Sequence, residues 1–393
     1  MFFAMTYKYK TIHELATYAY LDARRHERCR LPQLEFEVDV ERNIARLAGQ
    51  LSSRTWRPGP MEWFVLDSPS IREVFAPAFR DRVVSHILFN LIAPIFERYF
   101  IHDSFSCRKG KGTLYGIQRF EHHIRSVTRN YTQPAWCLNI DISGYFMSID
   151  RTRLYDIIWK ILGKNRAKHP DEIDYDFADY LLRAFLFRDP VKDCKFVGRQ
   201  NLIGLVPDNK SLFKQAAGIG LPIGDVGNQL NSNIYLNELD HFVKRELGAR
   251  NYCRYVDDAR ILRADYGRLL EDKERVAEFL ERELAMTLHP TKTSITDLYE
   301  TNYFLGAAIK PYRRHAKNDT MGRLRAFVKE ADAQLAEGAD PLEILPVLNS
   351  RLGYLSHFDE WKALDRAIQG APNLLRAFTF NKGYTKAKTI NNR

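Results

Sequence analysis

Two adjacent carboxylates, Asp257 and Asp258, interrupt an otherwise apolar segment at residues 252–262. The short apolar arms on either side predict a β-hairpin that carries the aspartates at its turn. Side-by-side carboxylates repel each other there, and nothing in the local fold requires both of them. A divalent cation would relieve the repulsion, and magnesium prefers such oxygen ligands. The pair therefore indicates either a two-metal site for displacement at phosphorus or an ordinary Asp-Asp turn.

A third carboxylate, Asp141, lies near the end of an apolar segment at residues 136–142 that predicts a buried strand. An acidic residue in that position can instead cap the N-terminus of a helix. Asp150 precedes the segment Arg151-Thr-Arg-Leu154 and is the better candidate for capping. We therefore interpret Asp150 as structural and Asp141 as a metal ligand.

Composition limits the classes of protein to be considered. The chain has 393 residues, a net charge of +10 and 45% apolar residues, enough for two or three domains with a hydrophobic core. The positive charge favours nucleic acid as a partner, although a solvated basic surface would give the same excess. The sequence has neither a run of 18 apolar residues nor an apolar N-terminal stretch, so no membrane partner is expected. Five scattered cysteines without C-x-x-C indicate a cytoplasmic protein without a zinc module.

The remaining patterns give a coarse map of the chain. Helical spacing is found at residues 1–55, where a basic stretch covers 24–30, and at 83–96, 228–247 and most of the last ninety residues. A strand is expected at residues 63–66, a loop at 188–218, and a basic, frayed tail at 381–393. Strands and helices mix without regular βαβ alternation, which predicts an α+β fold.

Seven ordered blocks of this sequence resemble those of bacterial reverse transcriptases. Three resemble the palm motifs: Asp141-Ile-Ser-Gly-Tyr-Phe146, Gly220-Leu-Pro-Ile-Gly-Asp-Val-Gly-Asn-Gln229 and Tyr255-Val-Asp-Asp258. Four resemble the fingers and the segments after the catalytic hairpin: Ile71-Arg-Glu-Val74 with Phe79-Arg-Asp-Arg82, Ser104-Phe-Ser-Cys-Arg-Lys-Gly-Lys-Gly112, His289-Pro-Thr-Lys292, and Tyr303-Phe-Leu-Gly306. The resemblance implies a right-hand polymerase with a helical basic N-terminal extension (1–55), fingers and palm (56–300), and a helical thumb with a basic tail (301–393).

The activity that this resemblance implies is RNA-directed DNA polymerisation with two Mg²⁺ ions, for which Mn²⁺ is an alternative. It assigns Asp141, Ile142 and Asp257 to the metal site, with Asp258 close by and less directly engaged. Lys292 would protonate the leaving pyrophosphate, although a lysine after a turn can also be simply solvated.

The resemblance also assigns residues to the nucleotide and to nucleic acid. Arg72 would bind the incoming triphosphate, and Phe146 would be a steric gate against the ribose 2′-hydroxyl; the alternatives are a surface charge and a core aromatic. The other assigned residues are Ile223, Gly224 and Gln229 at the nucleotide, and Arg80, Arg82 and Arg108 at nucleic acid. One of Arg80 and Arg82 could instead pair with Asp81.

The 220–229 block carries the finer information about subtype. Ile223 before Gly224, together with the closing Gln229, resembles the diversity-generating retroelement type, whose enzymes misincorporate opposite template adenine. Asn228 and the insert at residues 188–218 depart from that type, and an antiphage defence-associated reverse transcriptase is the rival. Expected partners are template RNA, primer and cDNA, dNTPs, and a small accessory protein or a non-coding RNA. An RNA polymerase, a nucleotide cyclase and a non-catalytic RNA-binding scaffold remain as other classes, although Phe146 argues against ribonucleotide use.

Overall fold

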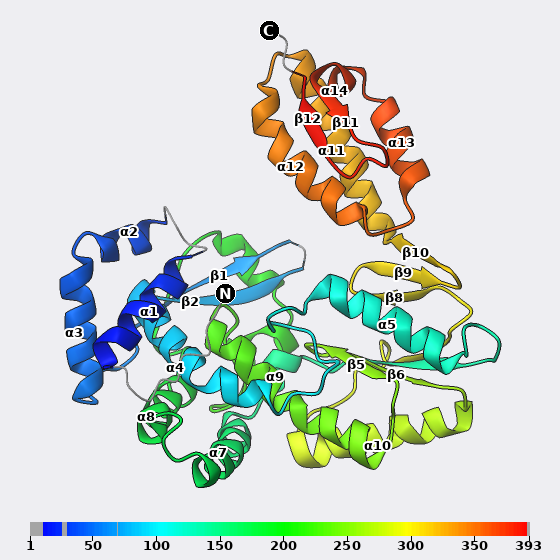
Figure 1. Cartoon of the computed structure of the whole chain (residues 1–393). Helices are drawn as coiled ribbons and strands as arrows, with labels where there is room; N and C mark the ends of the chain where they lie inside the picture. The colour runs from blue at the N-terminus through cyan, green and yellow to red at the C-terminus, as the bar shows by residue number, and fades with distance from the viewer. Residues whose placement is uncertain (1–10, 26–29, 69, 391–393) are drawn as a thin grey trace. The chain divides into compact units, whose positions relative to one another are not determined.

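The structure is a computed structural model that describes residues 11–25, 30–68 and 70–390 (Figure 1). Its residues form two compact units, each built from separate stretches of the chain. The first comprises the described part of Met1–Gly112 with Leu138–Ile261 and Gly267–Ser294. The second comprises Thr113–Cys137, Leu262–Tyr266 and the described part of Ile295–Arg393. The mixture of helices and strands confirms the α+β prediction, whereas the division at residues 55 and 300 stays a prediction.

The three N-terminal helices of the first unit pack against one another, and the first two of them also pack on α4 (Figure 1). Their bounds are α1 (Ile12–Arg24), α2 (Leu31–Glu37), α3 (Val40–Ser52) and α4 (Phe79–Glu97). Thr11 and Glu14 form a reciprocal capping box that starts α1, which buries its small and apolar residues on one face. Arg24 and Arg25 of the predicted basic stretch form ion pairs with Glu37 and Asp22. Residues 26–29 of that stretch lie outside the described residues.

A three-stranded sheet in the order β2-β1-β4 follows these helices. Its strands are β1 (Met61–Leu66), β2 (Arg72–Pro77) and β4 (Cys194–Phe196). The pair β1–β2 is antiparallel, and β4 joins β1 in parallel. Since β4 lies inside the insert at 188–218, the prediction of a loop there was wrong for these three residues. The Phe196 ring lies 4.7 Å from that of Trp63, a non-local contact that the local sequence does not signal.

The rest of the insert includes three short 3-10 turns between α8 (Tyr175–Leu186) and the segment that precedes α9 (Val226–His241). They are Gln200–Leu205, Asp208–Lys210 and Leu212–Lys214.

A four-stranded sheet carries the predicted catalytic motifs, with the order β5-β6-β3-β7. Its strands are β3 (Trp136–Ile140), β5 (Tyr252–Tyr255), β6 (Asp258–Arg263) and β7 (Ser294–Asp297). The helices α6 (Tyr145–Ser148), α7 (Arg151–Lys168), α8 (Tyr175–Leu186), α9 (Val226–His241) and α10 (Tyr266–Leu284) complete this part of the chain. Asp150 accepts hydrogen bonds from the backbone N–H groups of Thr152 and Arg153, so its predicted capping role is confirmed. The predicted 228–247 helix is α9, continued by a π-helical turn at Phe242–Glu246.

The second unit contains the predicted C-terminal helices. They are α11 (Asn318–Ala336), α12 (Pro341–Leu355), α13 (Trp361–Gln369) and α14 (Pro372–Ala377), with α5 (Thr113–Val127) in the same unit. Strands β8 (Asn302–Phe304), β9 (Ala307–Lys310) and β10 (Arg313–Ala316) form an antiparallel sheet, and β11 (Phe378–Phe380) pairs with β12 (Ala387–Thr389).

The C-terminal tail differs from the prediction of a frayed end. Phe378 and Ala387 are almost fully buried, and the Asn349 side chain hydrogen-bonds the backbone N–H and carbonyl of Ala387. These non-local contacts hold the β11–β12 hairpin although the sequence there is polar and basic. Residues 391–393 of the predicted tail lie outside the described residues.

Within residues 11–25, 30–68 and 70–390, no helix combines the length and the apolar character needed to cross a membrane.

Candidate active site

The turn of the β5–β6 hairpin presents the predicted carboxylates. Tyr255 pairs with Asp258, so Val256 and Asp257 form a two-residue connection. Val256 has a φ of 57°, in the left-handed region that a β-branched residue rarely adopts. Such a conformation is strained and persists only where the surroundings hold it.

The buried side chain of Arg254 holds Val256 in this conformation. The Arg254 and Asp240 side chains are both completely buried, and they form a bidentate ion pair with distances of 2.7 Å (Nε) and 2.6 Å (Nη2). The remaining nitrogen, Nη1, donates a hydrogen bond of 2.8 Å to the carbonyl of Val256. Helix α9, which carries Asp240, therefore holds the strained residue next to Asp257 through one guanidinium group.

Further contacts hold the strand that carries Arg254. The Tyr252 hydroxyl donates to the same Asp240 carboxylate at 2.8 Å. The Arg254 N–H donates to the Asp103 carbonyl, and the Arg254 carbonyl accepts from the N–H of Phe105. Sequence reasoning missed Arg254 and Asp240. The available signal was a charged residue within an otherwise apolar arm, which has to find a buried partner.

Asp141 follows β3 directly and is held by the segment that precedes β7. Its carbonyl accepts hydrogen bonds from the N–H of His289 (2.8 Å) and the hydroxyl of Thr293 (3.2 Å). Ile142 is buried and forms an antiparallel bridge with Leu288. The ammonium group of Lys292 lies 3.7 Å from the Asp141 carboxylate. The fold therefore brings together Asp141 and Lys292, which are far apart in the sequence.

The electrostatics of the carboxylates favour a cation. Burial raises the pKa of Asp257 to about 6, and the charges of Asp141 and Asp258 act in the same direction, while Lys292 opposes them. Asp258 forms an ion pair with Arg260. In the part of the chain that the structure describes, no three His, Cys, Asp or Glu side chains form a ready-made metal-binding group. The carboxylate oxygens and the raised pKa of Asp257 fit a hard divalent cation, with Lys292 and Arg260 as the counter-charges present here.

Three of the predicted nucleotide-site residues lie around β2 and α6. The N–H of Phe75 donates to the carbonyl of Ile223 at 2.7 Å, which fixes the 220–224 segment to β2. A Cβ atom at Gly224 would lie 2.6 Å from the Phe75 carbonyl oxygen, and Gly224 has a φ of +126°, so glycine is required. The carbonyl of Phe146 accepts from the N–H of Leu221 at 2.8 Å. These contacts bring Phe146, Ile223 and Gly224 together.

Arg72 and Gln229 differ in how they are held. The buried Nε atom of Arg72 has no hydrogen-bond partner among the described residues. A guanidinium with an unused donor is suited to an anion such as a triphosphate. Gln229 is exposed in the first turn of α9 and accepts a hydrogen bond from the Cys107 thiol at 3.3 Å.

The three arginines assigned to nucleic acid make contacts within the protein. Arg80 donates to the Gln50 side chain at 2.7 Å, and Arg82 donates to the Pro77 carbonyl at 3.0 Å. The Arg108 side chain is only 5% exposed, is paired with Glu97 at 2.6 Å, and also donates to two backbone carbonyls. Arg108 thus supports the loop that contains it, and the nucleic-acid roles of all three stay predictions. Asp81 accepts a hydrogen bond from the N–H of Gly59.

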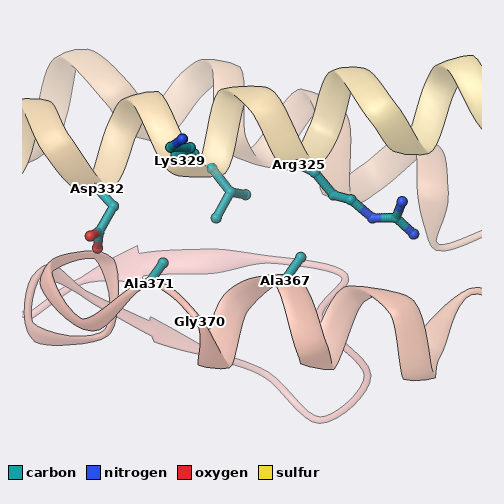
Figure 2. Close-up of a pocket in the computed structure, with 7 residues that line it drawn as sticks. Arg325, Lys329, Asp332, Ala367, Gly370 and Ala371 are labelled. Atoms are coloured by element: carbon teal, nitrogen blue, oxygen red, sulfur yellow. The ribbon is translucent and has the colours of Figure 1, made fainter.

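A separate cavity of about 180 Å³ lies in the second unit (Figure 2). Figure 2 shows Arg325, Lys329 and Asp332 on one helix, opposite the segment that carries Ala367, Gly370 and Ala371. Asp332 accepts hydrogen bonds from the N–H groups of Asn373 and Leu374, so its carboxylate is used in packing. None of the predicted site residues lines this cavity.

The match to a family model agrees with the motifs. The family model described as "Reverse transcriptase (RNA-dependent DNA polymerase)" matches residues 67–309. Protein YkfC of Escherichia coli (strain K12) is 23% identical over 339 residues, which are 74% of this chain and 76% of that protein. Among solved structures, telomerase from Candida albicans in complex with the TWJ fragment of telomeric RNA matches with a TM-score of 0.47 and 10% identity. That match covers 86% of this chain, which spans 60% of the telomerase chain.

The buried ion pair gives a testable prediction about stability. Asp240→Asn leaves the Arg254 charge without a buried counter-charge, and we expect the free energy of unfolding to fall by about 3–5 kcal/mol. The matched control is Glu283→Gln, which removes an exposed partner of Arg282 and should cost less than about 0.5 kcal/mol. Urea denaturation of both variants measures the difference. A loss below about 1 kcal/mol in Asp240→Asn would contradict the role given to the pair.

Proposed function

Because the chain belongs to the reverse transcriptase family and is an RNA-directed DNA polymerase, we propose that Asp141, Asp257 and Asp258 form its catalytic centre. The observation that carries this proposal is the half-buried Asp257 at the hairpin turn, whose pKa is raised to about 6 by partial burial and by the charges of Asp141 and Asp258. In this proposal Asp141 and Asp257, with Ile142, hold two magnesium ions. Asp258, already paired with Arg260, contributes less directly.

The bound ions would lower the pKa of the primer 3′-hydroxyl and neutralise charge on the transferring phosphoryl group. The protein's own residues orient the nucleotide. Arg72 binds the triphosphate through its unused donors, and the Phe146 ring excludes a ribose 2′-hydroxyl. Lys292, 3.7 Å from Asp141, holds the proton that the leaving pyrophosphate takes up.

We also propose that the chain works in a diversity-generating retroelement. Ile223 supports this role because an aliphatic side chain cannot form hydrogen bonds with a nascent base pair. Asn228 does not oppose it, since its side chain is buried and donates to the Pro222 carbonyl at 2.9 Å, where it holds the loop that carries Ile223. The proposed partners are template RNA, the primer or cDNA, dNTPs, and a small accessory protein or non-coding RNA. We also propose a reducing, cytoplasmic setting, because the five cysteines of the sequence are scattered and include no C-x-x-C pair.

Asp257→Ala should abolish magnesium-dependent dNTP incorporation, because a carboxylate proposed to hold both metal ions is lost, while RNA binding stays nearly unchanged. The measurements are primer extension on an RNA template and a filter-binding titration of the same RNA. Asp156→Ala, at an exposed position of α7, is the matched control and should retain synthesis. Retained dNTP incorporation by Asp257→Ala would contradict the assignment of the catalytic site. Absence of synthesis by the wild-type protein would favour a non-catalytic RNA-binding scaffold.

Phe146→Ala should admit ribonucleotides, because the ring that occupies the space of the 2′-hydroxyl is removed. Steady-state incorporation of dNTPs and rNTPs on one template measures the ratio of their kcat/KM values. Phe187→Ala, at an exposed aromatic position just after α8, should leave the ratio unchanged. An unaltered preference for dNTPs in Phe146→Ala rules out the gate.

The biological role is tested by sequencing nucleic acids that copurify with the wild-type protein and with Asp257→Ala, from a host that carries the native flanking DNA. We expect a cDNA that appears only with the wild type, matches a neighbouring template and has its errors at template adenines. A wild-type-only product that is repetitive or templated elsewhere would refute the diversification role and favour antiphage defence.

A further inference from the structure

We propose that the insert sets the position of Phe146 and thereby determines selectivity for the nucleotide sugar, with Leu212 as the main positioning residue. This inference rests on the proposed function, since it assumes that Phe146 faces the sugar of the incoming nucleotide. It assigns a role to a segment that none of the reverse transcriptase motifs includes.

The insert is attached to β2 by a buried carboxylate. Glu73 is only 3% exposed and accepts hydrogen bonds from the Ser211 hydroxyl (2.6 Å) and the Leu212 N–H (2.7 Å). The ring of Phe213 adds contacts to the same sheet, with its centroid 4.6 Å from that of Trp63 and 5.7 Å from that of Phe75. The segment 211–213 is therefore fixed to the strand that also bonds the Ile223 carbonyl.

The insert also packs closely against two backbone segments next to Phe146, one at Gly144 and one at Gly220. A Cβ atom at Gly220 would lie 2.6 Å from the Cδ1 atom of Leu212. A Cβ atom at Gly144 would lie 2.7 Å from the carbonyl oxygen of Asn209. Gly144 starts the short helix α6, which contains Phe146, and Gly220 precedes the residue whose N–H binds the Phe146 carbonyl. The backbone on either side thus has no room to move toward the insert.

Apolar packing links the insert to the Phe146 side chain. Leu212, which is 2% exposed, forms a buried cluster with Met61, Phe75 and Met147. Phe146 and Ile223 are half-buried and pack against that cluster. Shortening Leu212 would leave a cavity into which neighbouring side chains can relax. Retreat of the Phe146 ring would then open the space that a ribose 2′-hydroxyl needs.

The experiment measures sugar selectivity in the full-length chain. In Leu212→Ala, we expect the ratio of kcat/KM for rNTP to that for dNTP to rise by about tenfold, mainly through a lower KM for rNTP. Leu205→Ala is the matched control, since Leu205 lies in the same insert but is 55% exposed, and its ratio should equal that of the wild type. Leu212→Met keeps nearly the same side-chain volume, so the ratio in this variant should stay close to that of the wild type.

A ratio within twofold of wild type in folded Leu212→Ala overturns the inference, as does an equal rise in Leu205→Ala. If Leu212→Ala does not fold, Ser211→Ala replaces it, because this variant removes only one hydrogen bond to Glu73. We then expect a smaller rise in the same direction, and an unchanged ratio overturns the inference. Failure of the wild-type protein to incorporate dNTPs overturns the proposed function itself, and the inference with it.

Discussion

The geometry of the catalytic turn depends on the buried ion pair between Arg254 and Asp240. Two charges removed from water cost several kcal/mol each, and only close, hydrogen-bonded pairing offsets that cost. Here the Nε and Nη2 atoms of the guanidinium donate to the Asp240 carboxylate, and Nη1 donates to the Val256 carbonyl. The aspartate at the tip of the hairpin is thus aimed by a helix that lies earlier in the chain. Removal of either charge would release a backbone conformation that Val256 does not adopt by preference.

The strand β2 supports the nucleotide side of the site in a comparable way. Successive side chains of a strand point to opposite faces, so Glu73 and Phe75 share the buried face while Arg72 points to the more open one. The buried face carries the contacts to the insert and to the rings around it. On the other face, the half-buried side chain of Arg72 has a buried Nε donor without a partner among the described residues. One short strand therefore combines structural support with a group available to a ligand.

Local signals in the sequence predicted those parts of the site that depend on neighbours along the chain. The apolar arms around Asp257 and Asp258 predicted the hairpin. The place of Asp150 just before a helical segment predicted that it caps the N-terminus of that helix. Partners that are far apart in sequence could not be predicted in the same way. Three such contacts are visible only in the folded structure. They are the pairing of Arg254 with Asp240, the pairing of β4 with β1, and the hydrogen bond from Ser211 to Glu73. The tail was predicted to fray because its sequence is polar and basic. The burial of Phe378 and Ala387 depends on packing against distant parts of the chain, which the local sequence does not signal.

The division into two units has a consequence for how the chain can be made and cut. The chain enters the second unit at Thr113, returns to the first at Leu138, and alternates once more around residue 262. A ribosome must therefore reach Ser294 before the first unit has all of its segments, while most of the second unit is still to be synthesised. For the same reason no single cleavage yields either unit as one uninterrupted fragment. The boundary between Cys137 and Leu138 lies inside β3 (Trp136–Ile140), so this one strand contributes residues to both units.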